Sequence, residues 1–292
     1  MDVEPLLSVR CDWGEGPRWN ADEGALDWVD IAGRCFYTFT PATGDVARYE
    51  VGQQIGCLAF RAAGGLVMAA EAGFTFWDRP TEALTVVADP PDRDRAQEPR
   101  FNDGAVDPQG RFWAGTIAAE PEQRPTARLY RLDPDRSVHT LASGVGVANG
   151  IGWSLDHRTM YFTDSPRRVI YAYDFDPATG AIDHRRPFAR LDDEDGVPDG
   201  LAVDSQGLVW SAIWDGWRVV RFDPDGRVER ELPLPVQRPT SCAFGGPQLD
   251  ELYITSAWVG LNERQRQEQP SAGGLFRVHV GVRGVVEPRF AG

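Results

Sequence analysis

Short apolar segments bounded by turn residues recur along the chain. Residues 111–116 (RFWAGT), 160–164 (MYFTD) and 208–213 (LVWSAI) each have the length of a strand, and turn sequences such as 108–110 (PQG) precede them. Proline presets φ in turns of this kind, and Gly or Asp tolerates the positive-φ position. The pattern therefore predicts short strands joined by tight turns.

Four segments with the same kind of opening precede or contain such strands. Each begins with a short polar residue or Glu, passes a glycine and continues into an apolar stretch. The second and third openings are 47 positions apart and the third and fourth are 50 apart, whereas the first precedes the second by nearly twice that distance. A weaker unit must therefore lie between the first two. The residues that head the four segments are Glu15, Asn102, Asn149 and Asp199.

Two weaker copies bring the number of units to six. They contain residues 55–60 (IGCLAF) and 241–245 (SCAFG), and together the six units cover nearly the whole chain. Units of roughly 40 to 50 residues built from four strands are typical of propeller blades. We therefore expect an all-β fold, a six-bladed β-propeller with four antiparallel strands per blade, in a single domain over residues 1–292. A solenoid of the same unit is the rival architecture, but the chain lacks helical repeats and capping-like ends.

The two ends of the chain are expected to close the ring. Residues 4–10 would pair with the last blade, which removes exposed strand edges. The longest irregular stretches are residues 89–100 and 260–274. We expect both to be surface loops.

Charge narrows the choice of partners. The formal net charge is −14 and the pI is about 4.7. Proteins that neutralise nucleic-acid phosphates or bind anionic bilayers need basic surface, so neither partner is expected. No apolar run approaches the roughly 18 residues of a membrane span, and the N-terminal residues lack the pattern of a signal peptide. We expect a soluble cytoplasmic protein, monomeric, that acts on a small molecule.

Cysteine and histidine do not form a pattern of their own. The cysteines are scattered without a C-x-x-C pair, so reduced, buried thiols are expected. The four histidines lie away from the segment heads and are expected to be solvated or otherwise satisfied. No G-x-S-x-G motif supports a catalytic serine. The cysteines are Cys11, Cys35, Cys57 and Cys242.

The four segment heads carry the candidate chemistry. The first strand of each propeller blade lines the central channel, so residues that head equivalent inner strands converge on one ring. Two carboxylates and two amides supply only oxygen donors, which suit a hard cation, Ca²⁺ first, with Mg²⁺ and Mn²⁺ possible and Zn²⁺ less natural. The plainer interpretation is that Asn and Asp precede Gly because they form Asx-turns. That interpretation does not explain Glu15, and we expect a metal site.

The sequence resembles the family of the senescence marker protein SMP-30 (regucalcin), the gluconolactonases and the luciferin-regenerating enzyme. The resemblance covers essentially the whole chain, and six ordered motifs carry it. They are residues 14–17 (GEGP), 100–104 (RFNDG), 114–116 (AGT), 149–156 (NGIGWSLD), 198–200 (PDG) and 240–246 (TSCAFGG). The family fold is a six-bladed propeller, in agreement with the repeat.

The resemblance also implies roles for individual residues. It implies that Glu15, Asn149 and Asp199 ligate one divalent metal ion and that Asp199 is also the general base. The spacing alone leaves Asn102 as a fourth residue at the metal, whereas the resemblance implies a contact with substrate. The residues implied to contact substrate hydroxyls or the carbonyl are Arg100, Asn102 and Glu120.

The resulting hypothesis is a lactone hydrolase. The expected substrate is a small sugar lactone, an aldonolactone such as gluconolactone or a pentonolactone, and the product is the aldonic acid. An organophosphate or aryl-ester hydrolase is one alternative, and a non-catalytic calcium-binding regulatory protein is another. Ala105 and residues 121–126 depart from the family pattern. Both departures concern the identity of the substrate more than the chemistry.

Overall fold

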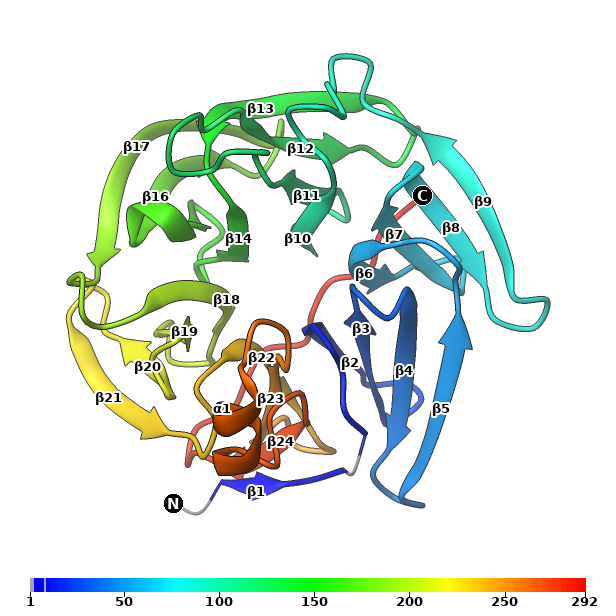
Figure 1. Cartoon of the computed structure of the whole chain (residues 1–292). Coiled ribbons are helices and arrows are strands. Elements are labelled where there is room, and N and C mark those ends of the chain that lie inside the picture. Colours follow the sequence, from blue (N-terminus) through cyan, green and yellow to red (C-terminus); the bar gives the residue numbers. More distant parts are fainter. Residues whose placement is uncertain (1–2, 8) are drawn as a thin grey trace.

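Six four-stranded sheets surround a central axis as the blades of a propeller (Figure 1). The computed structural model describes residues 3–7 and 9–292. Within each sheet, neighbouring strands are antiparallel, and the strands of the first five blades follow one another in chain order. The predicted six-bladed, all-β propeller is confirmed. The innermost strands, from the first blade to the sixth, begin at Gly14 (β2), Ile55 (β6), Phe101 (β10), Ala148 (β14), Val197 (β18) and Pro239 (β22).

The strands of the six blades, from the axis outward, are as follows. The first blade contains β2 (Gly14–Asn20), β3 (Ala25–Asp30), β4 (Cys35–Thr40) and β5 (Asp45–Glu50), and the second contains β6 (Ile55–Phe60), β7 (Leu66–Ala70), β8 (Gly73–Asp78) and β9 (Ala83–Ala88). The third contains β10 (Phe101–Val106), β11 (Phe112–Thr116), β12 (Ala127–Leu132) and β13 (Val138–Val145). The fourth contains β14 (Ala148–Trp153), β15 (Thr159–Asp164), β16 (Val169–Asp176) and β17 (Ala181–Arg190), with the 3₁₀-helix η1 (Ser165–Arg167) after β15. The fifth contains β18 (Val197–Val203), β19 (Val209–Trp214), β20 (Arg218–Phe222) and β21 (Val228–Pro233), and the sixth contains β22 (Pro239–Gly245), β23 (Glu251–Ser256), β24 (Phe276–His279) and β1 (Glu4–Pro5).

The sixth blade combines the two ends of the chain. Its strand order is β1-β24-β23-β22, and Glu4 pairs with Arg277 while Pro5 pairs with Phe276. The N-terminal strand is therefore the outer edge of a sheet whose other strands come from the C-terminal part. The expected closure by residues 4–10 is confirmed for β1, and Ser8 lies outside the described residues.

Both long irregular stretches lie on the surface and are anchored by a few buried residues. In residues 89–100, the fully buried Glu98 carboxylate accepts hydrogen bonds from Thr116 Oγ1 at 2.7 Å and from Tyr130 Oη at 3.1 Å. Residues 260–274 contain the short helix α1 (Glu263–Glu268), and Gln269 just after it is almost fully buried. Most residues of both stretches are exposed, so the expected surface position is confirmed, and a few buried polar side chains anchor them to the blades. Among the residues described, no helix has the length and apolar character that a membrane crossing requires.

Packing between blades forms the core. The indole of Trp210 meets the ring of Phe244 edge-on, with 6.1 Å between ring centroids, so β19 of one blade packs against β22 of the next. Phe74 and Phe101 make a similar contact between the second and third blades. All four cysteines are buried and form no disulfide, as expected. Apolar side chains between sheets thus hold the six inner strands in fixed positions around the axis.

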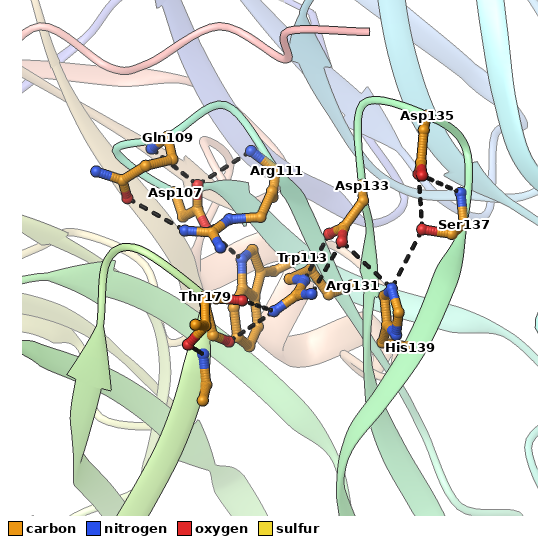
Figure 2. Close-up of polar contacts among 12 residues, drawn as sticks. Asp107, Gln109, Arg111, Trp113, Arg131, Asp133, Asp135, Ser137, His139 and Thr179 are labelled. Atoms are coloured by element: carbon orange, nitrogen blue, oxygen red, sulfur yellow. Dashed lines mark hydrogen bonds and ion pairs between the residues drawn. The ribbon is translucent and has the colours of Figure 1, made fainter.

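A buried aspartate ends the inner strand of the third blade and organises the turn that follows. Asp107 Oδ1 accepts hydrogen bonds from the backbone N–H groups of Gln109 at 2.9 Å and Arg111 at 3.0 Å (Figure 2). Its other oxygen accepts from the indole N–H of Trp113 at 3.0 Å and from Arg111 Nε at 2.6 Å. One carboxylate therefore fixes the turn, the next strand and a core tryptophan.

The fifth blade repeats this arrangement. Asp204 accepts hydrogen bonds from the backbone of Gln206 and Leu208 and from the indole N–H of Trp210, the last at 2.9 Å. Its counter-ion is Arg221, whose Nη2 lies 2.7 Å away and which comes from β20, whereas Arg111 follows Asp107 in the same turn. The Asp-x-x-Gly-x-x-Trp spacing, shared by residues 107–113 and 204–210, thus corresponds to one turn structure, which follows the inner strand in the third and fifth blades.

Candidate active site

Every inner strand has an irregularity in its register near its first residues. The shifts fall at equivalent places in all six blades, as between Glu15 and Arg18 in β2 and between Asn149 and Ile151 in β14. A β-bulge redirects side chains and is common beside functional sites. In four blades the residue at the bulge is a buried oxygen donor. These residues are the four predicted heads, Glu15, Asn102, Asn149 and Asp199.

The glycine that follows a head allows the inner strands to approach one another. A Cβ atom on Gly150 would lie 2.7 Å from the carbonyl oxygen of Asp199, and one on Gly200 would lie 2.1 Å from Ser241 Oγ. Both distances are shorter than a non-bonded contact permits. The Asn-Gly and Asp-Gly pairs in the sequence are therefore explained by strand proximity at the channel, in addition to turn preference.

Two buried carboxylates face an unfavourable environment at this ring. Glu15 and Asp199 are only 3% and 4% exposed. Burial, followed by the charge of Asp103, raises the pKa of Glu15 to about 8. Burial, followed by the charge of Glu15, raises the pKa of Asp199 well above its ordinary value. Oδ1 of Asp199 has no hydrogen-bond partner among the described residues. The two groups repel each other, and a proton or a cation would relieve that repulsion.

The two amides are held by a continuous set of hydrogen bonds. Asn102 Nδ2 donates to Asn149 Oδ1 at 2.7 Å and to the carbonyl oxygen of Ala148 at 2.8 Å. Asn149 Nδ2 donates to Ser165 Oγ at 2.7 Å, and that hydroxyl donates to the carbonyl oxygen of Pro198 at 2.6 Å. The Asn149 amide is therefore fixed from both sides, between β10 and the strand that carries Asp199.

Arg100 lies at the rim of the same ring. Its Nη1 donates to Asn102 Oδ1 at 2.6 Å and to the carbonyl oxygen of Phe101 at 3.0 Å, and the guanidinium carbon lies 4.5 Å from the centre of the Trp13 ring. Burial lowers the pKa of Arg100 to about 10, against the opposing charges of Glu15 and Asp199. The guanidinium remains protonated at neutral pH. Its positive charge acts on both head carboxylates and lowers the pKa of each, against the larger effect of burial.

Glu120 differs from the other predicted site residues. It is exposed on the segment after β11, where its carbonyl oxygen accepts a hydrogen bond from the N–H of Arg124 at 2.7 Å. Its carboxylate forms no hydrogen bond or ion pair within residues 3–7 and 9–292. The structure thus brings Glu15, Arg100, Asn102, Asn149 and Asp199 together, but it gives no contact between Glu120 and them.

Two charged residues of the site were not predicted. Asp103, next to Asn102, is buried and raises the pKa of Glu15, and its own pKa is raised by burial. Arg18 is also buried, with Nη2 3.9 Å from Asp103 Oδ1 and donating to the carbonyl oxygen of Gly104. For Asp103 the sequence did offer a signal, because this residue lies between Asn102 and Gly104 in the Asn-Asp-Gly motif. Asn102 and Asp103 are adjacent and both buried, as are most residues of this inner strand, and the register shift between Phe101 and Gly104 falls on them.

The residues at the ring fit a divalent cation with oxygen ligands. Glu15 and Asp199 would neutralise its charge, and Asn149 would add an amide oxygen. Asp199 Oδ1, which has no hydrogen-bond partner among the described residues, would serve as one of the ligands. Throughout the described residues, no three Asp, Glu, His or Cys side chains group in a way that could hold a metal ion. The candidate set has only two carboxylates and therefore depends on the amide. The four histidines are exposed, so none is part of the set.

Comparison with known proteins gives consistent similarities. Residues 13–258 match the model of the SMP-30/Gluconolactonase/LRE-like region. Regucalcin of Xenopus laevis is 38% identical to the chain, over 100% of this chain and 99% of that protein. The crystal structure of a calcium-binding protein, regucalcin, from Agrobacterium tumefaciens superposes with a TM-score of 0.92 at 26% identity, over 98% and 96% of the two chains. A gluconolactonase from Xanthomonas campestris superposes with a TM-score of 0.76 at 25% identity, over 97% and 89%.

Proposed function

Because the chain belongs to the SMP-30/gluconolactonase/LRE-like family, we propose that it is a metal-dependent lactone hydrolase. The proposed substrate is a small sugar lactone, an aldonolactone such as gluconolactone or a pentonolactone, and the product is the aldonic acid. The similarity to a gluconolactonase supports the reaction class. The observation that carries the proposal is the pair of buried, mutually repelling carboxylates, Glu15 and Asp199, at the ring of inner-strand heads. We propose that the protein acts as a cytoplasmic monomer.

Glu15, Asn149 and Asp199 would hold the metal ion, Ca²⁺ first, with Mg²⁺, Mn²⁺ or Zn²⁺ as alternatives. The similarity to a calcium-binding protein supports the first choice. When bound, the ion supplies positive charge that stabilises negative charge on the lactone carbonyl oxygen. The oxygen-only donor set suits Ca²⁺ better than Zn²⁺, which prefers His and Cys.

Asp199 is the proposed general base. As water adds to the lactone carbonyl carbon, the Asp199 carboxylate takes a proton from that water. The bond between the carbonyl carbon and the ring oxygen then breaks, and the ring oxygen leaves as a hydroxyl after gaining a proton.

Arg100 is the proposed donor to substrate oxygens. Among the described residues, only Nη1 of its guanidinium has hydrogen-bond partners, so Nε–H and the Nη2 hydrogens are free to donate to an oxygen that gains negative charge. Asn102 holds Nη1 of Arg100 in place and would also order a ring hydroxyl. Glu120 would contact a hydroxyl from the rim.

The test is a proton-release assay with a panel of aldonolactones, on chelator-treated protein with and without each of the four metal ions. Metal-dependent turnover by the wild-type protein and its loss in Asp199→Asn would support the proposal. Turnover that does not change when metal is removed would contradict the metal dependence. Absence of turnover with every metal and lactone would contradict the reaction class.

A second candidate is hydrolysis of an aryl ester, and the aromatic rim favours it. The rings of Trp13 and Trp214 lie 5.9 Å apart, with Arg100 over the first and Arg238 4.8 Å from the centre of the second. Such a surface would bind an aromatic leaving group. Phenyl acetate and an aryl phosphotriester should therefore be assayed beside the lactones, with Trp13→Ala as the variant. Calcium binding without turnover of any of these compounds would instead favour a non-catalytic regulatory protein.

A further inference from the structure

A second cavity lies at the other end of the central channel. The candidate active site is at the first residues of the inner strands, whereas this cavity is lined by their last residues, including Phe60 of β6, Val106 of β10, Trp153 of β14 and Phe244 of β22. It encloses about 280 Å³. None of the predicted site residues contributes to its walls.

The C-terminal segment crosses this end of the channel and forms one wall. The N–H of Gly284 donates to the carbonyl oxygen of Leu249 at 2.7 Å, and the N–H of Phe290 donates to the carbonyl oxygen of Phe60 at 2.8 Å. Phe290 is fully buried. In Figure 1 the red C-terminal trace passes near the axis from the sixth blade toward β7 and β8. Residues 285–288, which we name the strap, lie between these two attachments and line the cavity.

The charged groups at the cavity are unequally matched. Glu287 Oε1 in the strap accepts a hydrogen bond from Arg18 Nη1 at 3.2 Å, and Arg18 also lies 3.9 Å from Asp103. One guanidinium is thus shared by two carboxylates, of which only Glu287 lines the cavity, where His157 is the other titratable side chain in the wall. Glu287 is the more accessible carboxylate, with 33% of its side chain exposed, and its Oε2 has no partner within the described ranges.

The remaining walls are mainly apolar, with Ser154 and His157 as the polar side chains, and they are partly open to water. Val286 of the strap is 68% exposed, and Val285 and Leu155 are also exposed. Exposed apolar side chains around a concave surface mark a binding site when they are contiguous. The wall also contains the aromatic residues Phe60, Trp153 and Phe244, and the guanidinium carbon of Arg289 lies 5.4 Å from the centre of the Phe60 ring.

We propose that this cavity binds a small molecule with an aromatic or aliphatic body and one protonated amine. The amine would lie against Glu287 Oε2, and the body would fill the space between the strap and the ends of the inner strands. At about 30 Å³ per water-sized group, the volume accommodates a body of roughly nine non-hydrogen atoms. The proposal does not depend on the lactone hydrolase.

The test uses 2-phenylethylammonium as the probe, with 2-phenylethanol and 3-phenylpropanoate as neutral and anionic counterparts, in isothermal titration calorimetry. We expect the ammonium probe to bind at one site and about fivefold more tightly than the alcohol, as one charged contact supported by aromatic faces provides. Equal affinity for the alcohol, or stronger binding of the carboxylate, would overturn the proposal.

Variants locate the binding. Glu287→Gln should reduce the affinity for the ammonium probe to that of the alcohol, whereas Glu229→Gln should leave it unchanged. Glu229 is the matched control because it is 35% exposed and pairs with the buried Arg221 at 3.1 Å, away from the cavity. Ala202→Leu, which adds volume to the cavity wall, should weaken binding of both probes and keeps the test valid if Glu287→Gln fails to fold.

A further titration in the presence of Ca²⁺ distinguishes binding in this cavity from binding at the acidic ring at the other end of the channel. Titrations of the wild-type protein with and without saturating Ca²⁺ should give the same affinity for 2-phenylethylammonium. Loss of binding in Ca²⁺ would mean that the amine occupies the ring of Glu15 and Asp199, and this result would overturn the proposal.

Discussion

Asn102 Nδ2 donates a hydrogen bond to Asn149 Oδ1 at 2.7 Å, and this bond joins the head of one inner strand to the head of the next. The bond fixes which way the Asn149 amide points, because Asn149 Nδ2 is at the same time bound to Ser165 Oγ. Asn102 Oδ1 itself accepts from Arg100. Asn102 therefore orients both a proposed metal ligand and a proposed substrate contact, which relates the two roles considered for it from sequence.

Replacing Asn102 with Ala should weaken calcium binding as well as substrate binding. Loss of a buried hydrogen-bond donor costs about 1–3 kcal/mol and frees the Asn149 amide to rotate. We expect a Ca²⁺ affinity reduced by about tenfold, with a higher KM for the lactone. Calorimetric titration with Ca²⁺ and steady-state kinetics measure the two effects.

Ser165→Ala is the control for the Asn102 variant. It removes the other partner of the Asn149 amide but leaves Arg100 untouched. It should lower Ca²⁺ affinity with little change in KM at saturating metal. An unchanged Ca²⁺ affinity in both variants would show that the orientation of Asn149 does not matter for the metal.

Asp199→Asn should abolish most of the proposed hydrolysis while keeping the fold. The amide cannot accept the proton from water, and general base catalysis contributes about 10²- to 10⁴-fold to a rate. We expect kcat to fall by that factor, with Ca²⁺ still binding through Glu15 and Asn149 at reduced affinity. Turnover measured at saturating Ca²⁺ separates loss of the base from loss of the metal, and turnover close to wild type would remove Asp199 from that role.

Stability of the metal-free protein should fall as pH rises. The pKa of Glu15 is about 8 in the folded protein, above its ordinary value of 4.5, and the pKa of Asp199 is raised in the same direction. A raised pKa means that the folded state binds the proton more tightly than the unfolded chain. This contribution is complete below the ordinary pKa and is lost as pH rises through about 8. The Tm of chelator-treated protein should therefore fall between about pH 5 and 8, by several degrees.

Calcium should reverse this pH dependence. A bound cation stabilises the ionised carboxylates, so the increase in Tm on adding Ca²⁺ should be largest near pH 8 and small near pH 5. Glu15→Gln removes one of the two titrating groups and should flatten the pH dependence of the metal-free protein. A Ca²⁺ effect that is equal at both pH values would argue against binding at this ring.

Asp204→Ala should destabilise the fifth blade strongly. The variant leaves Arg221 buried without its main counter-ion and Trp210 without its acceptor, and loss of one member of a buried ion pair costs about 3–5 kcal/mol. Asp223→Ala is the control. Asp223 accepts the same two backbone hydrogen bonds in a turn, from Asp225 and Arg227, but binds no tryptophan, so we expect a loss of about 1 kcal/mol. Urea denaturation would measure both, and equal losses would contradict the role assigned to the buried aspartate.

The repeat could be recognised in the sequence because the strands and turns of a blade lie close together along the chain. Turns such as the one after Asp107 leave a pattern within about ten residues, and the heads of the inner strands recur with the blade. The ring of Glu15, Asn102, Asn149 and Asp199 could thus be anticipated from spacing, whereas the particular roles within it came from the resemblance. Their exact hydrogen bonds could not be anticipated, because bulges set the direction of each side chain.

Contacts that do not recur from blade to blade could not be predicted from the sequence. Arg18 and Glu287 are 269 positions apart, and although Arg18 lies in the first repeated segment, Glu287 belongs to no blade strand. Residues 89–100 looked like an exposed loop because their sequence is polar, but the buried Glu98 is polar for a structural reason, as the acceptor of Thr116 and Tyr130. Polar composition alone does not distinguish a solvated loop from one anchored by a buried carboxylate.

The pairing of β1 with β24 has a consequence for how the chain reaches its native state. Glu4 is made early on the ribosome but must wait for Arg277, near the other end, before its strand has a partner. Five blades can form from contiguous segments as synthesis proceeds, whereas the sixth cannot. The entropy of joining such distant ends grows only logarithmically with length, so the delay is set mainly by the order of synthesis. Closure of the propeller should therefore be the last step of folding, and the nascent chain should remain an open ring until β24 has been synthesised.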